Sequence, residues 1–376
     1  MPVTDWSNQF YGREWPELVT IRDKILVIED RDYMRDSVET TVAHINSALA
    51  SDKQYIIFNC PCEALQTFSL DKIHTIVERV PGLNHKDVFH VTGTVPGQSD
   101  YEKYALARGH SFRITILGTI SQLCNFRESA KHLSQLLDQE YDIKIKDKKF
   151  VCFNKVHKGH RVYILAKMLE KGLISQSYFS FEGSRPDWYT DLSHGIYDWA
   201  PVIQEQVSKN LHLFPIRLNI TPARGNPVTL SADDLIYHLN SYFSIVTETV
   251  FYKKHLDRAT IYNNEDGIFF TEKTSRPLLL KHPFILAGYA NSLKMLRTYG
   301  FNTFHPYINE SYDSEEDDDL RLDMIVSETE RLCRFTDEQW IEFQTDIKPV
   351  VEHNFLTLRN MLLYHGIQNI LDKFTS

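Results

Sequence analysis

The sequence predicts an α/β protein with two Rossmann-like domains facing a cleft and a helical segment at the C-terminal end. Three observations support this fold class. The chain has 376 residues, which is too long for one ordinary hydrophobic core and suits two domains of similar size. Short apolar runs alternate with amphipathic stretches, and the alternation occurs twice along the chain. The composition, with 42% hydrophobic and 24% charged residues, is that of a globular protein.

The first series of elements lies in the N-terminal part of the chain. We expect strands at 24–28, 54–59, 87–94 and 112–118, and helices at 35–49, 69–80 and 101–109. Ser69 is expected to cap the second of these helices. Short connections between strands and helices favour a parallel sheet that is covered on both faces.

A second series begins with a strand at 149–154. It continues with a helix at 160–174 that ends at Gly172, a strand at 177–181 and an irregular region at 185–230. A stretch at 231–243 leads into a strand at 244–249, and a strand at 282–288 precedes a helix that ends at Gly300. We therefore expect an acceptor domain at 1–145, a donor domain at 146–335, and closing helices at 336–376 that return to the first domain.

The charge of the chain is unevenly distributed. A net charge of −9 argues against a protein that coats nucleic acid. Seven acidic residues lie between Glu310 and Asp319, a stretch that we expect to be a surface loop. The segment 144–161 has a local charge of +6 and is expected to hold phosphate; its basic residues are Lys144, Lys146, Lys148, Lys149, Lys155, Lys158 and Arg161.

No run of 18 apolar residues occurs, and the N-terminus lacks an apolar core flanked by basic residues. We expect a cytoplasmic protein with no membrane partner. The five cysteines lack the paired spacing of a zinc site and are expected to be free thiols.

Polar residues that follow strands of the second series form the candidate binding site. Asn154 and Lys155 end one strand just before the helix that contains Arg161, and such a junction favours a diphosphate; the alternative is a solvated basic turn. Glu248 ends another strand at the same expected sheet edge. Glu272 begins a helix, where it either caps that helix or accepts hydrogen bonds from the two hydroxyls of a ribose. The dinucleotide fingerprint and the phosphate loop ending in Gly-Lys-Ser/Thr are missing, which argues against dehydrogenases and ATPases.

Three stretches, at 154–181, 241–249 and 269–313, resemble the donor domain of GT-B glycosyltransferases found in phages, large viruses and some bacteria. The Glu-Lys helix is also similar to that of fucosyltransferase-like enzymes. The resemblance implies GT-B architecture, a nucleotide-sugar co-substrate, in the first instance a UDP-sugar, and no further cofactor.

Carried over by residue, the resemblance assigns two groups of donor contacts. It places Asn154, Lys155 and Arg161 at the donor diphosphate. The residues that it assigns to the nucleotide and sugar are Glu248, Thr249, Glu272 and Lys273. The chain departs from the family pattern at Asn309, where Asp is usual, and at Val156, where a basic residue is usual. The segment from Glu310 to Asp313 is expected to be a helix start and a structural loop.

Transfer with inversion needs a base for the acceptor hydroxyl and stabilisation of the departing diphosphate. Asp30 and Glu63 are the candidate bases, ahead of Glu29 and Asp32, because each follows an expected N-terminal strand; the alternative for each is a surface acid or a helix cap. Lys and Arg can neutralise the diphosphate, and no Asp-X-Asp triplet stands among the donor-site residues. We therefore expect transfer without a metal ion.

The resemblance to phage enzymes makes a hydroxymethylated pyrimidine in duplex DNA, in the host cytoplasm, the first expected acceptor. A glycan, lipid or protein hydroxyl is the alternative. A catalytically silent nucleotide-binding module and a nucleotide-sugar epimerase of the same architecture also remain open, as does the oligomeric state. Only an enzyme would turn over the donor.

Overall fold

The computed structural model describes residues 24–29, 34–60, 67–92, 94–95, 97–118, 141–154, 158–181, 200–216, 232–252 and 268–375. The chain divides into two compact units. Unit 1 comprises residues 1–124, 256–270 and 360–376, and unit 2 comprises 125–255 and 271–359. The predicted domain limits stay a prediction.

Unit 1 contains a parallel sheet of four strands. Their order is β1 (Ile25–Glu29), β2 (Tyr55–Cys60), β3 (Val88–Thr92) and β5 (Thr115–Gly118). The helices between them are α4 (Val38–Ala50), α5 (Thr67–Glu78), the 3-10 helix η1 (His85–Asp87) and α6 (Gly97–Ala107). β4 (Thr94–Val95) pairs antiparallel with β9 (Ile268–Phe269). The order in the sheet follows the order in the chain, so these strands contain no reversal.

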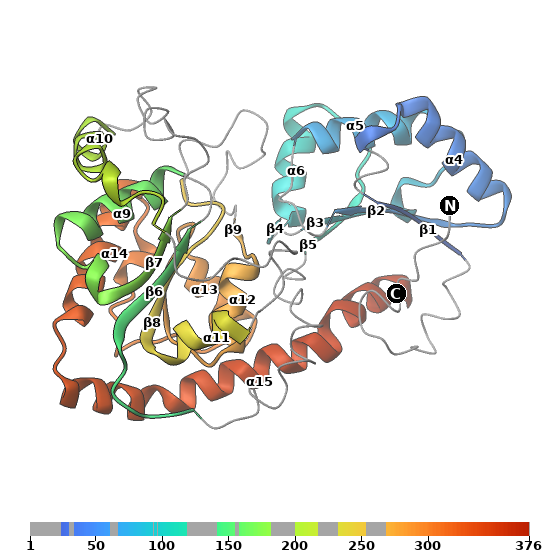
Figure 1. The fold of residues 1–376 in the computed structure, drawn as a ribbon. Coiled ribbons are helices and arrows are strands. Elements are labelled where there is room, and N and C mark those ends of the chain that lie inside the picture. Colours follow the sequence, from blue (N-terminus) through green and yellow to red (C-terminus); the bar gives the residue numbers. More distant parts are fainter. Residues whose placement is uncertain are drawn as a thin grey trace. The chain divides into compact units, whose positions relative to one another are not determined.

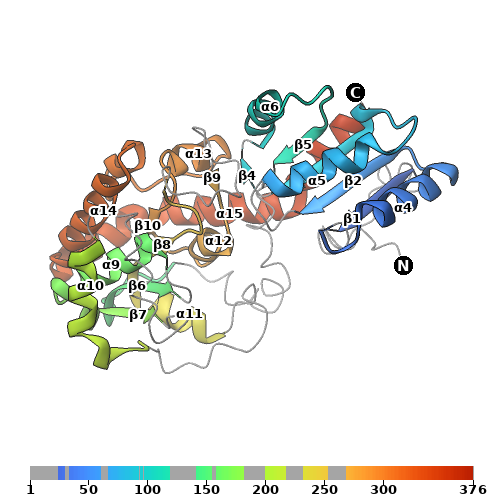
Figure 2. The ribbon, with the colours of Figure 1, turned by 90° about the horizontal axis from the view of Figure 1, so that it is seen from above.

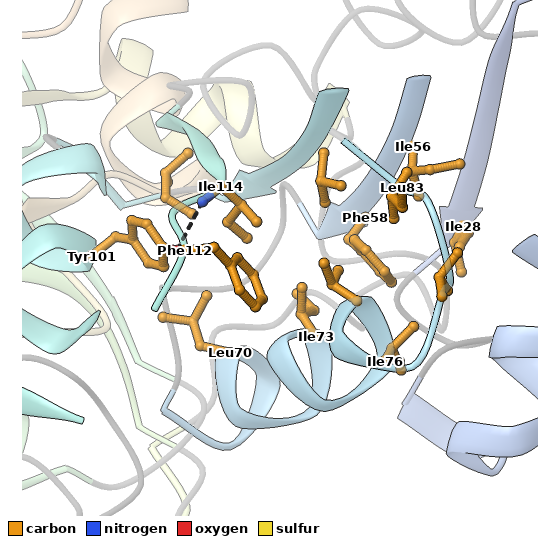
Figure 3. Close-up of a cluster of buried hydrophobic side chains, with 14 of the residues drawn as sticks. Ile28, Ile56, Phe58, Leu70, Ile73, Ile76, Leu83, Tyr101, Phe112 and Ile114 are labelled. Atoms are coloured by element: carbon orange, nitrogen blue, oxygen red, sulfur yellow. Dashed lines mark hydrogen bonds between the residues drawn. The ribbon is translucent and has the colours of Figure 1, made fainter. Parts of the chain in front are cut away.

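Alternation along β2 explains how both faces of this sheet become buried. Ile56 and Phe58 lie in the large core, whereas Ile57 lies in a smaller cluster on the other face. The large core is completed by α5, whose Leu70 and Ile73 turn toward the strands (Figure 3). The three-residue spacing of these apolar side chains places them on one face of the helix.

Unit 2 contains the second parallel sheet, in the order β10 (Phe284–Ala287), β8 (Ser241–Thr247), β6 (Lys148–Asn154) and β7 (Ser177–Phe181). Its helices are α9 (Gly159–Glu170), η3 (Ile174–Gln176), α10 (Ala200–Lys209), η5 (Leu211–Leu213), α11 (Ala232–Leu239), α12 (Glu272–Leu279), α13 (Ser292–Thr298), η6 (Ser311–Ser314) and α14 (Asp318–Cys333). α9 and α14 lie on one side of this sheet, and α11 and α12 lie on the other (Figures 1 and 2).

The last helix, α15 (Asp337–Thr375), begins against this second sheet. The ring of Trp340 stacks on Tyr242 of β8, with centroids 4.0 Å apart. Phe343, Ile347 and Val351 continue the buried stripe of α15 at helical spacing. None of the described helices has an 18-residue stretch that is apolar enough to span a bilayer.

The predicted α/β class is confirmed, because each unit is built on a parallel sheet with helices. Four local predictions are wrong. Ser69 lies inside α5, which begins at Thr67, and donates a hydrogen bond to the sulfur of Met34, so it is not the N-cap residue of this helix. The strand expected at 244–249 begins earlier, since β8 spans Ser241–Thr247. Helix α10 lies in the region expected to be irregular, and α14 begins within the stretch expected to be a surface loop.

Candidate functional site

The candidate site lies where the chain order reverses within the unit 2 sheet. β6 leads through α9 to β7 on one side, whereas β8 and then β10 lie on the other side of β6. Ligands of open parallel sheets bind at the carboxyl ends of the strands at such a switch point. The last residues of the two central strands meet there, because the hydroxyl of Thr247 donates to the side-chain oxygen of Asn154 at 2.6 Å.

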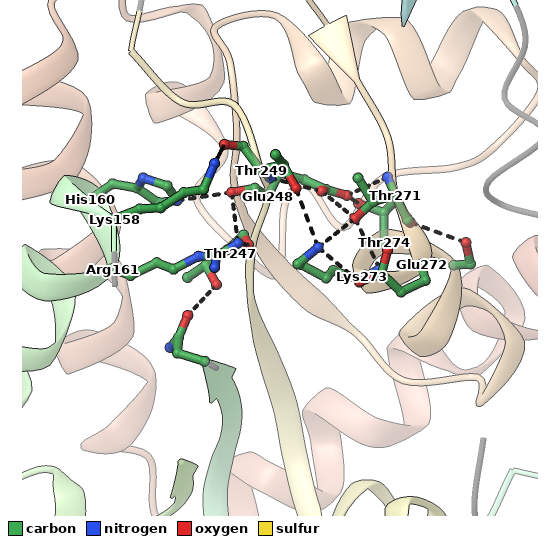
Figure 4. A network of polar contacts seen from close by, with 12 residues as sticks. Lys158, His160, Arg161, Thr247, Glu248, Thr249, Thr271, Glu272, Lys273 and Thr274 are labelled. Atoms are coloured by element: carbon green, nitrogen blue, oxygen red, sulfur yellow. Dashed lines mark hydrogen bonds and ion pairs between the residues drawn. The ribbon is translucent and has the colours of Figure 1, made fainter. Parts of the chain in front are cut away.

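The Glu248 carboxylate joins the end of β8 to the start of α12 (Figure 4). One oxygen accepts from the backbone N–H of Thr271 at 2.9 Å and from the hydroxyl of Thr274 at 2.6 Å. The other accepts from the hydroxyl of Thr271 at 2.6 Å and from the N–H of Thr249 at 3.2 Å. The residue is 2% exposed. Glu248 therefore holds two segments of the chain in register at this sheet edge.

The start of α9 is fixed to the same strand end. The Arg161 guanidinium donates to the carbonyl oxygens of Thr247 and Glu248, at 3.1 and 3.4 Å. His160 binds the carbonyl of Glu248 at 2.9 Å, and burial holds its pKa well below the ordinary value. Its neutral ring therefore donates from Nε2 to that carbonyl. Lys158 is the N-cap residue of α9 without a side-chain cap bond, and its ammonium donates to the carbonyl of Thr249 at 2.9 Å.

A more accessible layer lies above these buried contacts. Thr249, Glu272 and Lys273 are each half-buried. The Lys273 ammonium contacts the Glu272 carboxylate at 2.9 Å, the hydroxyl of Thr271 at 3.0 Å and that of Thr249 at 3.4 Å (Figure 4). Burial raises the pKa of Glu272, but the Lys273 ammonium, a backbone hydrogen bond and the Arg276 charge together lower it by more, so Glu272 is a carboxylate at neutral pH.

A small cavity of about 50 Å³ adjoins this layer, between the sheet and α12. Thr247, Lys273 and Arg276 contribute to its wall. The Arg276 guanidinium lies over the ring of Phe153, 5.9 Å from its centroid. Sequence reasoning missed Arg276, although its position four residues after Glu272 on one helix signals a shared face.

The structure places six of the seven predicted donor residues at this edge: Asn154, Arg161, Glu248, Thr249, Glu272 and Lys273. The seventh, Lys155, lies outside the described residues. Asn154, Arg161 and Glu248 belong to the buried layer. The predicted bases Asp30 and Glu63 lie outside the described residues, as does Asp32. Their roles stay predictions.

No protein-family model matches the sequence, and no curated protein matches it. Among solved structures, the chain is similar to α,α-trehalose 6-phosphate synthase from Burkholderia multivorans, with a TM-score of 0.42 and 13% sequence identity. The likeness covers 95% of this chain and 72% of that one. A likeness at this level gives no information on reaction or substrate.

The basic segment at 144–161 does not form one patch. Lys148 and Lys149 stand at the start of β6 on opposite faces, and Lys149 lies over the ring of Trp340. Lys158 lies beyond the other end of this seven-residue strand, which spans roughly 20 Å at the usual rise per residue. Arg161 is buried. The expectation of a single phosphate-holding segment is wrong, because the strand separates its two halves.

The segment from Glu310 to Asp313 has the expected structural role. Asp313 accepts from the N–H groups of Leu293 and Lys294, at 2.8 and 3.0 Å, and so caps α13. Glu310 pairs with Arg297 at 3.3 Å. Burial raises the pKa of both carboxyl groups.

Two Asp-X-Asp triplets, the pattern associated with metal-dependent glycosyltransferases, stand outside the donor-site motifs. The triplet at 30–32 lies outside the described residues. In the triplet at 317–319, Asp317 caps α14 and Asp318 forms a buried ion pair with Arg321 at 2.6 Å. The carboxylates of Asp317 and Asp318 are therefore engaged in contacts at the start of α14.

Proposed function

We propose that the chain is a nucleotide-sugar-dependent glycosyltransferase whose donor binds at the carboxyl edge of the unit 2 sheet. The observation that supports this most is the grouping of Lys158, Glu272 and Lys273, all half-buried, around the β6–β8 switch point. A nucleotide sugar carries a diphosphate, a ribose diol and a sugar. A site for it needs cations, a carboxylate and hydroxyl groups together.

The proposed contacts follow from this chemistry. The start of α9, with Lys158 and Lys273, binds the diphosphate, since N–H groups and the helix dipole favour anions. Glu272 accepts from the ribose hydroxyls. Arg276 supplies a further positive charge beside the cavity. The buried Arg161 and Glu248 position these groups.

These cations stabilise the leaving diphosphate directly, so we propose that donor binding and transfer need no divalent metal ion at this site. The proposed donor is a UDP-sugar, which rests on the sequence resemblance. The proposed acceptor is a hydroxymethylated pyrimidine in duplex DNA, with a glycan, lipid or protein hydroxyl as the alternative. Asp30 or Glu63 is the proposed base.

The test is a panel of nucleotide sugars, screened by thermal shift and by release of nucleoside diphosphate. For the donor that binds, Lys273→Ala should weaken affinity by about 10- to 150-fold, the range of a lost charged hydrogen bond. Lys171→Ala is the matched control. Both lysines pair with a glutamate and their side chains are 26% and 31% exposed, but Lys171 follows the other end of α9.

The outcomes separate the alternatives. Diphosphate release, with a sugar transferred to hydroxymethylated DNA and not to unmodified DNA, supports the full proposal. Release with transfer only to another hydroxyl supports the glycosyltransferase and rejects the DNA acceptor. Binding without release indicates a silent module, and conversion of the donor sugar alone indicates an epimerase. If no nucleotide sugar binds, the proposed donor site is refuted. If EDTA abolishes donor binding, the proposed independence of metal ions is refuted.

A further inference from the structure

Three side chains of unit 1 that are common metal ligands lie together, and none of them is one of the donor-site residues. His74 and Glu78 are four residues apart on α5 and so share one face of the helix. His110 follows α6. The nearest ligand atoms of the three residues all lie within 4.8 Å of one another.

His74 is held with one ring nitrogen available. Its Nε2 is 3.1 Å from the hydroxyl of Tyr101, whose oxygen accepts from the N–H of Ile114 at 2.9 Å (Figure 3). The residue is 1% exposed, and no hydrogen-bond partner among the described residues reaches its Nδ1. A buried nitrogen without a partner is unusual. Burial lowers the pKa of His74 to about 4, which leaves the neutral ring that metals bind.

A second chain of contacts sets the tautomer of His110. The hydroxyl of Tyr104 donates to the carboxylate of Asp71, so the oxygen of Tyr104 accepts from Nε2–H of His110, at 3.3 Å. In the neutral ring, the lone pair is then on Nδ1. Metal-binding histidines are commonly supported in this way through the nitrogen that faces away from the metal.

We propose that His74, Glu78 and His110 bind one divalent transition-metal ion of the zinc type. Two imidazole nitrogens and one carboxylate oxygen are a known zinc ligand set, with water in the fourth position. Ligand atoms around tetrahedral zinc lie about 3.4 Å apart, so the group must close around the ion. Glu78 is exposed and His110 is half-buried, and both can rotate. His110 leaves its 3.6 Å ring stack with His74 as it does so.

The position of this site in the fold indicates a structural role. Glu78 ends the helix that precedes β3, and His110 precedes β5, so the site lies toward the amino ends of these strands. Substrates of parallel sheets bind at the opposite, carboxyl ends. The metal ion would join α5 to the connection between α6 and β5, and so stabilise unit 1.

The test is a titration of Zn²⁺ into the full chain after its metal has been removed. We expect one equivalent to bind and to raise the unfolding temperature, as any ligand of the folded state does. Co²⁺ should bind with visible absorption bands and without thiolate charge-transfer absorption. Glu78→Gln and His110→Ala should weaken binding by more than about 100-fold, and Tyr104→Phe by about 10- to 100-fold.

His44→Ala is the matched control, because His44 is an exposed histidine of the same unit and should leave the affinity unchanged. The substitutions at Glu78 and His110 change accessible side chains, so folded variants are expected, and circular dichroism checks this. If both variants bind Zn²⁺ as tightly as the unchanged chain, or if the unchanged chain binds no equivalent, the proposal is refuted. Donor affinity is a separate measurement, which Glu78→Gln should not alter.

Discussion

Glu248 illustrates how the chemistry of a residue depends on partners that are distant in the sequence. Its type and its place at a strand end suggested a ligand contact. Its four hydrogen bonds instead go to Thr249, Thr271 and Thr274, up to 26 positions away. The sequence could show that a carboxylate stands at the sheet edge, but not that the chain itself satisfies it. The accessible Glu272 is the better candidate for a ribose contact.

Glu248→Gln should lower the free energy of unfolding by about 2–3 kcal/mol. The amide replaces one accepting oxygen with a donor, which leaves buried N–H and hydroxyl groups without an acceptor. Denaturant unfolding of the purified variant measures the change.

Glu170→Gln is the control for this experiment. Glu170 also carries a carboxylate in unit 2, but its ion pair with Lys167 is exposed and should contribute less than about 1 kcal/mol. Equal stability of the two variants would show that the buried network does not hold the site together.

Helix starts are where sequence and structure differ most. The strand at 177–181 was predictable to the residue, because it is a short run rich in aromatic residues and Gly172 ends the preceding helix with a φ of 65°. The acids at 317–319 indicated a loop, yet they begin α14, where Asp317 accepts from two N–H groups at 3.0 Å. Carboxylates at a helix start interact favourably with its dipole, and a count of charges does not distinguish this from a loop.

Trp340→Ala should destabilise unit 2 by about 3–5 kcal/mol, because it removes a fully buried ring that attaches α15 to β8. The neighbouring Ile341 is 37% exposed, and Ile341→Ala on the same helix should cost about 1 kcal/mol or less. Thermal and denaturant unfolding of the two variants test this. Similar losses of unfolding free energy in the two variants would mean that burial of the Trp340 face of α15 does not determine how this helix is attached to β8.

The two units differ in the order of their strands, which is the property that creates a binding site at the edge of a parallel sheet. The described strands of unit 1 follow one another across their sheet, whereas those of unit 2 reverse between β6 and β8. The sequence predicted two sheets from the repeated alternation of strands and helices. Strand order depends on crossover directions, which local patterns do not encode, so the switch point itself required the structure.

The most direct test of a donor site at the β6–β8 edge is hydrogen–deuterium exchange of the full chain, with and without a saturating nucleotide sugar. We expect slower exchange in peptides that cover 158–162, 247–252 and 271–276, and a smaller effect when Lys273→Ala is compared at the same ligand concentration. Slower exchange confined to unit 1, with these three segments unchanged at saturation, would contradict a donor site at the β6–β8 edge.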